Sequence, residues 1–250
     1  MLYYRLWFLS INNLFLRKVV FFVKKLLALV MALCLTLGCT TALAAGKLTV
    51  NQEAYLAMES YSFTGYIFAE VENTGDKNIE FANGLLEILT ADGEPMTSAD
   101  LYTMYPNVLA PGEKGYIYKS VYVDDAKSLD DIADHMLTLT GKSSQEEATP
   151  RLESSAVYAL DTDAWGDPEH VITVTLTNNT QETVYDCQVV YGLYDVEGKL
   201  LCVDYNNAYN IGIPAGQTIE YRFTVNDDIA AAWAAQGLTP DSAQSVVYPD

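Results

Sequence analysis

The chain has 250 residues, of which 33 are acidic and 14 are Lys or Arg, giving a net charge of −19. All the acidic residues follow position 44, whereas five of the basic residues precede it, so residues 45–250 carry a net charge of −24. Such a surface repels nucleic acid and anionic lipid headgroups, and we therefore expect neither as a direct partner.

The N-terminal segment has the pattern of an export signal. Lys24 and Lys25 precede an uncharged stretch, residues 26–46, whose first half is strongly apolar. Small residues up to Ala44 predict cleavage by signal peptidase after that position. We therefore expect residues 1–44 to be a signal peptide and the mature chain to be secreted or held at the cell surface. Residues 1–22 add a second hydrophobic segment, which we interpret as a mis-assigned upstream extension.

Two alternatives to simple secretion stay open. Cys39 follows Gly38 and would be acylated if this were a lipoprotein signal, although Thr36 stands where such a signal prefers Leu. The uncharged stretch is also long enough to cross a bilayer, so it would anchor the chain if retained. In either case the chain would meet a membrane only through its N-terminal segment.

Residues 67–98 and 172–203 align without a gap, as two copies of one unit. Apolar residues alternate at the start of both copies, which predicts strands with one buried face. The matching residues are Ile67, Ala69 and Val71 in the first copy and Ile172, Val174 and Leu176 in the second.

Turn and helix signals recur at matching positions after these strands. Acidic turns bearing Gly93 and Gly198 predict hairpins. Pro/Gly turns at 111–112 and 214–216 each open another strand, and Asp-Asp-Ile-Ala at 130–133 and 227–230 predicts a short helix. In the first copy, Ser128 with Asp131 resembles a capping box.

Short strands separated by turns predict an all-β protein with two tandem β-sandwiches, each with a short helix before its last strand. We place the first sandwich at residues 45–140 and the second at 153–250, after the hydrophobic N-terminal helix. Residues 141–152 are polar and contain Pro150, as a linker would.

Residues 191–195 (Tyr-Gly-Leu-Tyr-Asp) resemble the motif of the FxLYD domain, with Tyr191 in place of Phe. The flanking segments 176–180 and 213–216 resemble that family's "V-x-N-x-(T/G)" and "L-x-P-G-(E/Q)" patterns. The first copy retains both flanks but departs from the central motif. The resemblance implies immunoglobulin-like modules of bacterial exported proteins and lipoproteins, without catalytic function.

The second copy has a longer loop at residues 161–170 than the first has at 60–66. Its carboxylates suit Ca²⁺, for which the candidate ligands are Asp161, Asp163, Asp167 and Glu169. The alternative, which we favour, is a solvated turn with Trp165 packed on the sandwich edge. We expect no other cofactor, because two histidines cannot form a site of several imidazoles.

Tyrosines are abundant, with 16 of the 18 after residue 44. Most should pack in the core, but they would also suit a sugar- or peptide-binding face. The candidate positions are Tyr102 and Tyr105 in the first copy and Tyr205 and Tyr209 in the second.

Cys187 and Cys202 are the only cysteines after residue 44. If residues 196–197 are the hairpin tip, Cys202 faces Tyr191 and lies too far from Cys187 for a disulfide. We therefore expect two buried free thiols.

Three classes of function remain. The leading one is a non-catalytic extracellular or cell-envelope interaction or structural module with an unknown protein or glycan partner. The second is a ligand-binding accessory protein, for carbohydrate or Ca²⁺, that uses the 161–170 loop and surface tyrosines. The third is a hydrolase using Asp163 and Glu169, but no nucleophile motif or phosphate-binding loop accompanies these acids. We expect no enzymatic activity.

Overall fold

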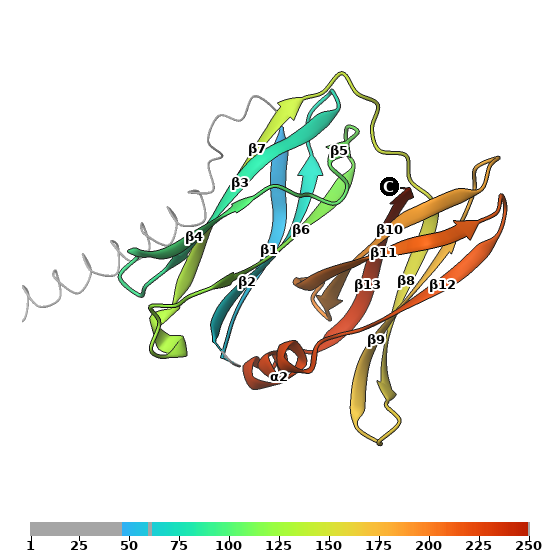
Figure 1. Cartoon of the computed structure of the whole chain (residues 1–250). Helices are drawn as coiled ribbons and strands as arrows, with labels where there is room; N and C mark the ends of the chain where they lie inside the picture. Colours follow the sequence, from blue (N-terminus) through green and yellow to red (C-terminus); the bar gives the residue numbers. More distant parts are fainter. Residues whose placement is uncertain (1–46, 60–61, 250) are drawn as a thin grey trace, which may run out of the picture. The chain divides into compact units, whose positions relative to one another are not determined.

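The computed structural model describes residues 47–59 and 62–249 (Figure 1). The predicted signal peptide with its extension 1–22, the cleavage position after Ala44 and the acylation candidate Cys39 all lie outside the described residues. Within them, the chain is mostly β-strand, as predicted. No helix of this part is long and apolar enough to span a membrane.

Strands dominate both halves of the described chain. In the first half the elements are β1 (Leu48–Glu59), β2 (Phe63–Asn73), β3 (Ile79–Leu89), β4 (Pro95–Leu101), β5 (Val108–Leu109), β6 (Lys114–Tyr122), the 3-10 helix η1 (Leu129–Asp131) and β7 (Asp134–Ser143). In the second half they are β8 (Glu153–Thr162), β9 (Pro168–Thr177), β10 (Val184–Asp195), β11 (Leu200–Ile213), β12 (Thr218–Thr224), α2 (Asp227–Gln236) and β13 (Pro240–Pro249).

The two halves have the same strand order. Sheet A is β1-β2-β6, and sheet B has β4 and β5 on one edge of β3 with β7 on the other. Sheet C, β8-β9-β12, repeats the order of sheet A, and sheet D, β11-β10-β13, repeats that of sheet B. All neighbouring strands are antiparallel, so hairpin turns can connect them.

A buried asparagine makes the same bonds in each half. Asn73 and Asn178 have no exposed surface, and each donates its side-chain amide to two backbone carbonyl groups. Each also exchanges backbone hydrogen bonds with the Pro/Gly turn before β6 or β12, where Gly112 and Gly216 have φ values of 77° and 72°. In each half, these hydrogen bonds directly join the two segments that flank the central motif in the sequence: the strand end with the asparagine and the Pro/Gly turn.

The predicted helix starts also form, but they differ in length. In the first half the carboxylate of Asp131 accepts the backbone N–H groups of Lys127 and Ser128, and η1 ends after three residues. In the second half Asn226 caps α2, which runs for ten residues and ends at Gly237. The first helix is short because the chain enters β7 three residues later.

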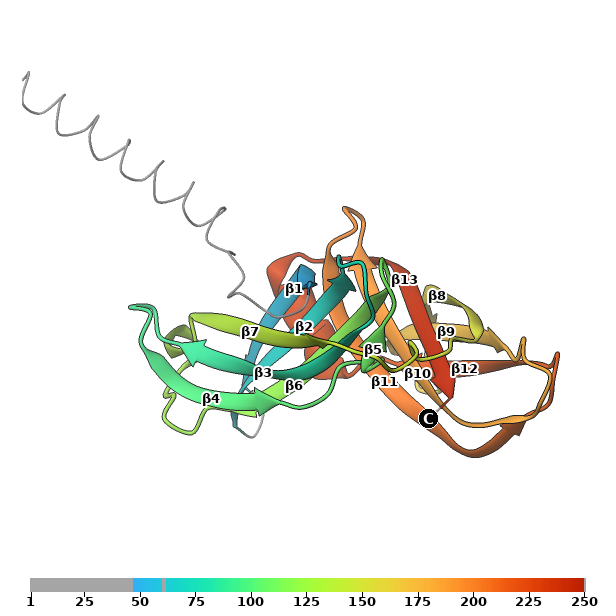
Figure 2. The same cartoon turned by 90° about the horizontal axis from the view of Figure 1, so that it is seen from above.

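Two clusters of buried side chains form the core. One lies between sheets A and B. The other lies between sheets C and D, and it also contains four residues of sheet A: Leu56, Met58, Phe68 and Tyr116. The outer face of sheet A is therefore packed against the second half of the chain, as the neighbouring positions of β2, β6 and β11 in Figure 2 also show.

This packing buries β2 and β10 on both faces. In β2, Ile67 and Ala69 face the first cluster, whereas Phe68 belongs to the second. The expectation of one buried face is therefore correct for β9, whose Thr173 and Thr175 are only half-buried, but wrong for β2.

A polar network lies within this contact. Glu70 of β2 is 1 % exposed, and its carboxylate accepts hydrogen bonds from Tyr194 at 2.5 Å and from Lys114 at 2.8 Å. The hydroxyl groups of Tyr116 and Tyr194 are 2.9 Å apart. A buried carboxylate needs such partners, because an unpaired one would lose its hydration without compensation.

The segment between the halves is bonded to both of them. β7 continues to Ser143, so the first residues of the predicted linker are part of a strand. Thr149 N–H bonds to Val108, the Arg151 guanidinium bonds to the carbonyl group of Lys114, and Leu152 is buried and bonds to Val247.

Candidate functional site

The predicted calcium loop is a tight turn at the end of the β8–β9 hairpin. Asp163 Oδ1 accepts the backbone N–H groups of Trp165 and Asp167 at 2.8 and 2.9 Å. Gly166 has a φ of 93°, a conformation that glycine adopts without strain. Hydrogen bonds from the backbone of Asp167 and Trp165 lower the pKa of the Asp163 carboxyl group.

The chain uses the same turn a second time, between β10 and β11. There Asp195 Oδ1 accepts the N–H groups of Glu197 and Lys199 at 2.8 and 2.9 Å, and Gly198 has a φ of 76°. An aspartate that binds its own backbone in this way stabilises a turn without any ligand. The role of Asp163 is therefore explained by the hairpin itself.

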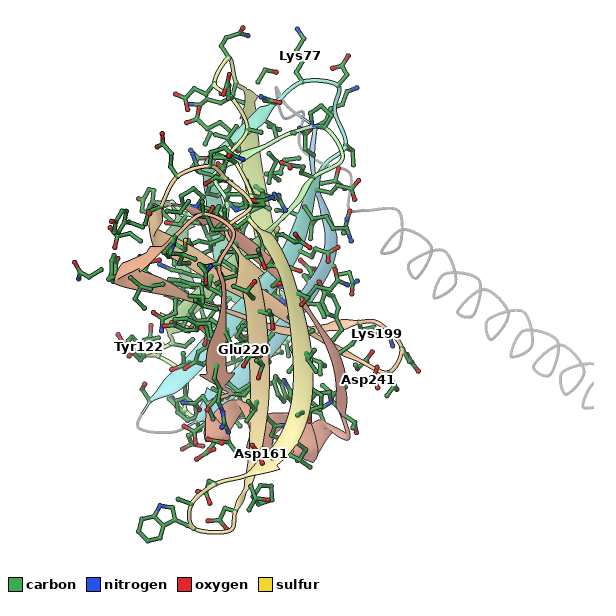
Figure 3. All side chains as sticks on the ribbon, turned by 90° about the vertical axis from the view of Figure 1, so that its right-hand side faces the viewer. Lys77, Tyr122, Asp161, Lys199, Glu220 and Asp241 are labelled. Atoms are coloured by element: carbon green, nitrogen blue, oxygen red, sulfur yellow. The ribbon has the colours of Figure 1, made fainter. Side chains whose placement is uncertain are left out.

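The two outer carboxylates of the loop bind an arginine. Asp161 and Glu169 are opposite each other on β8 and β9, and Arg222 Nη2 lies 3.2 Å from one and 2.7 Å from the other. Thr224 donates a further hydrogen bond to Glu169 at 3.1 Å. Figure 3 shows Asp161 at the base of the hairpin end, which projects beyond the neighbouring strands.

Of the four predicted ligands, Asp161 and Glu169 thus bind Arg222, and the carboxylate of Asp163 binds the backbone of its own turn. No group of three or more His, Cys, Asp or Glu side chains is arranged for a metal ion in the described part of the chain. Calcium binding by Asp161, Asp163, Asp167 and Glu169 stays a prediction.

Trp165 lies at the tip of this turn with its ring 89 % exposed. The expectation that it packs on the sandwich edge is therefore wrong. The hairpin carries the ring past the last residues of the sheet, so no neighbouring strand is available to cover it.

The candidate tyrosines fall into two groups. Tyr102 and Tyr209 are well exposed and bond locally, to Asp100 and to Asn207. Tyr105 and Tyr205, by contrast, stack on each other with ring centroids 4.3 Å apart. These two residues come from different halves of the chain, so the packing of the halves creates a joint aromatic surface.

Three further rings extend this surface, and we call the five together the aromatic row. The ring centroid of Tyr118 lies 6.2 Å from that of Tyr205. The ring centroids of Phe68 and Tyr66 lie 5.6 and 6.5 Å from that of Tyr118. The rings of Tyr66, Phe68 and Tyr118 are within about 22° of parallel. The aromatic row consists of Tyr66, Phe68, Tyr105, Tyr118 and Tyr205.

Tyr66 and Phe68 on β2 and Tyr118 on β6 were not predicted from the sequence as candidate site residues. A signal was present, since Phe68 aligns with Thr173 of the second copy. A large apolar ring on the face that is polar in the other copy indicates a second packing surface. This signal is found only when the residues on each face of a strand are compared with those on the same face of the matching strand in the other copy.

A pocket of about 130 Å³ opens beside the row. Its walls come from the aromatic row, from β11 and from the start of α2. The lining residues used below are Tyr66, Phe68, Tyr118, Tyr191, Asp204 and Asn226. Burial raises the pKa of Asp204, the acidic side chain of this lining.

A larger cavity of about 340 Å³ lies between β1, the β10–β11 turn and α2. Three of its polar side chains are already bound: Gln52 accepts the N–H group of Leu200, Lys199 pairs with Glu197, and Asp195 holds its turn. These bonds leave little there for a polar ligand to satisfy.

The cysteines, which are the candidate nucleophiles, are enclosed, and the two histidines lie outside the linings of both cavities. Cys187 and Cys202 are buried free thiols, as predicted, and burial raises the pKa of both. Cys202 nevertheless pairs with Leu193, not Tyr191, because Leu201 bulges and the turn is longer than expected. His135 lies in β7, and its ring stacks on that of Tyr55.

His170 is the second histidine, and its ring has a structural partner. Its Nδ1 atom lies 2.9 Å from the hydroxyl group of Tyr158 on the neighbouring strand. The two histidines therefore each pack against a tyrosine of their own half.

No protein-family model and no curated protein sequence matches this chain.

Proposed function

We propose that this chain is an exported, non-catalytic binding protein of the bacterial cell envelope, built from two tandem immunoglobulin-like sandwiches. The observation that carries the proposal is the stacking of Tyr105 on Tyr205, which joins aromatic residues of both halves into one row beside a pocket. Aromatic side chains present large contact areas at low entropic cost, which suits recognition.

The tandem arrangement is supported by the repeated strand orders and the paired asparagine corners. Export is supported by the basic and apolar N-terminal pattern and by the acidic surface that follows it. The non-catalytic assignment is supported by the enclosure of both thiols and by the turn-forming role of Asp163.

The experiment uses residues 45–250, which contain both core clusters. The wild type, Tyr205→Ala and Tyr102→Ala are each mixed with cell walls isolated from the bacterium that encodes the protein. The walls are then sedimented, and bound protein is measured in the pellet. Tyr102 is a matched control, because it is 74 % exposed and lies outside the aromatic row. We expect the wild type and Tyr102→Ala to sediment and Tyr205→Ala to remain in solution. Equal behaviour of all three proteins would refute the proposal.

Export is tested separately on the full chain. Mass determination of the mature protein distinguishes cleavage after Ala44 from lipid attachment at Cys39 and from a retained segment. Each of these products is compatible with an envelope protein, whereas intact precursor recovered only in the cytoplasm would contradict export.

A further inference from the structure

The pocket beside the aromatic row holds a carboxylate without a cationic partner. Asp204 is half-buried, and the hydrogen bond to its side chain comes from the backbone N–H group of Tyr205, at 2.8 Å. No basic side chain of the described residues forms an ion pair with it. Glu70, the other buried acid near this contact, is instead paired with Lys114. The pocket therefore offers a negative charge that the protein itself leaves uncompensated.

The walls of the pocket reinforce this charge. The half-buried rings of Tyr66 and Tyr118 line it and are within about 22° of parallel, whereas Phe68 and Tyr191, which also belong to its lining, are at most 1 % exposed. The faces of aromatic rings attract cations, and the attraction grows where water is excluded. Asp228, whose charge acts on Tyr66, adds a second acid near these rings. A cation in the pocket would meet aromatic faces and a carboxylate together.

The remaining lining selects among cations. Val203, Val225 and Ile229 are aliphatic, and Asn226 already uses its side-chain oxygen to cap α2. A primary ammonium group is strongly hydrated and carries three donors that need acceptors. A methylated ammonium group has few or no N–H donors, and its methyl groups suit an apolar wall. The volume of about 130 Å³ is close to that of cavities that hold a six-carbon ring.

We propose that this pocket binds a methylated ammonium group. The proposal rests on the function proposed above, because it assigns a ligand class to one end of the same aromatic surface. The half-buried rings of Tyr66 and Tyr118 hold the cation, and Asp204 supplies the opposite charge.

The test is calorimetric titration of residues 45–250 with choline and with 3,3-dimethylbutan-1-ol, an uncharged molecule of the same shape. We expect choline to bind about tenfold or more tightly than the alcohol, because only choline carries the charge. Asp204→Asn should remove this difference, whereas Asp241→Asn, which changes an exposed acid on β13, should preserve it (Figure 3).

A second variant guards against a folding defect. Tyr118→Leu keeps the charge of Asp204 but removes one ring, so it should weaken choline binding several-fold. The thermal unfolding of Asp204→Asn should stay close to that of the wild type. Phosphocholine is titrated in parallel, to separate a free quaternary amine from a phosphate-linked head group. We expect it to bind more weakly, because its phosphate adds negative charge to a ligand that must approach the carboxylate of Asp204.

The outcomes separate the two proposals. Choline that fails to bind, or that binds no better than the alcohol, overturns the ligand assignment. If Tyr205-dependent sedimentation with cell walls persists in that case, the binding function stands and only the ligand class is wrong. If neither is observed, both proposals fail.

Discussion

The hydroxyl group of Tyr194 donates a hydrogen bond to the carboxylate of Glu70, a residue 124 positions away in the sequence. Tyr194 is the second tyrosine of the Tyr-Gly-Leu-Tyr-Asp segment, and Glu70 lies on the outer face of sheet A. This bond and the neighbouring contacts of Tyr116 and Lys114 join the halves through groups that are largely removed from water.

Tyr194→Phe should lower the free energy of unfolding by about 1–3 kcal/mol, because the buried carboxylate of Glu70 loses a donor. Urea denaturation of residues 45–250 measures this change. Tyr102→Phe is the matched control, since it removes an exposed hydrogen bond to Asp100 and should change little. Similar losses in the free energy of unfolding of the two variants would show that the buried hydrogen bond stabilises the protein no more than the exposed one.

Stability should also depend on pH through Glu70. Burial raises the pKa of this carboxyl group, but hydrogen bonds from Lys114 and Tyr194 outweigh that effect, and the pKa lies below the usual 4.5. A lowered pKa means that the stabilisation is complete above about pH 4.5 and is lost as the pH falls toward the pKa of the folded state. Below about pH 4.5, the stability of Glu70→Gln should therefore fall less steeply with falling pH than that of the wild type.

Asn73→Ala and Asn178→Ala should each cost about 1–3 kcal/mol or more, because each leaves buried backbone carbonyl groups without donors. Since the bonds are equivalent in the two halves, the two losses should be similar. Asn206→Ala, at an exposed position of β11, provides the control. Thermal and urea unfolding give the values, and a large loss at only one of the two asparagines would contradict their structural equivalence.

Gly192→Ala should destabilise the protein by about 1–3 kcal/mol through overpacking. A Cβ atom at this position would lie 2.8 Å from the ring of Tyr116 across the contact between the halves. In a Tyr116→Leu background the cost should shrink, because the ring that causes the clash is gone. A double-mutant cycle in urea measures the coupling, and strictly additive losses would place the clash elsewhere.

Arg222→Met should increase the affinity of the 161–170 loop for Ca²⁺. In the wild type, a calcium ion must displace the guanidinium group from Asp161 and Glu169, whereas the variant leaves both carboxylates free. Its effect on stability should be below about 1 kcal/mol, because these ion pairs are largely exposed. Calcium titration of the two proteins checks this, and a variant that binds no better than the wild type would end the calcium prediction for this loop.

Local patterns predicted the strands and turns well. Alternating apolar residues located β2 and β9, and the glycines of the acidic turns located the β3–β4 and β10–β11 hairpins. The predicted register of the second hairpin was wrong by two residues at Cys202, because the turn is one residue longer than expected and Leu201 adds a bulge that leaves no mark in the alternation. The free state of both thiols was nevertheless predicted correctly.

The candidate site was predicted only in part. Tyr105 and Tyr205 were identified as surface candidates, but their stacking was not, and Tyr66, Phe68 and Tyr118 were missed. Asp204 was not singled out either, because an unpaired carboxylate is recognised only when the surrounding groups are known.

The sequence by itself determined the elements that depend on neighbouring residues: strand alternation, glycine turns, helix starts and the repeat of one unit. The tertiary structure alone decided which outer faces meet, and therefore that Glu70 contacts Tyr194 and that two tyrosines from different halves form one row. The physical reason is that strand and turn propensities act over a few residues, whereas the contact between sheets A and D depends on the packing of whole surfaces.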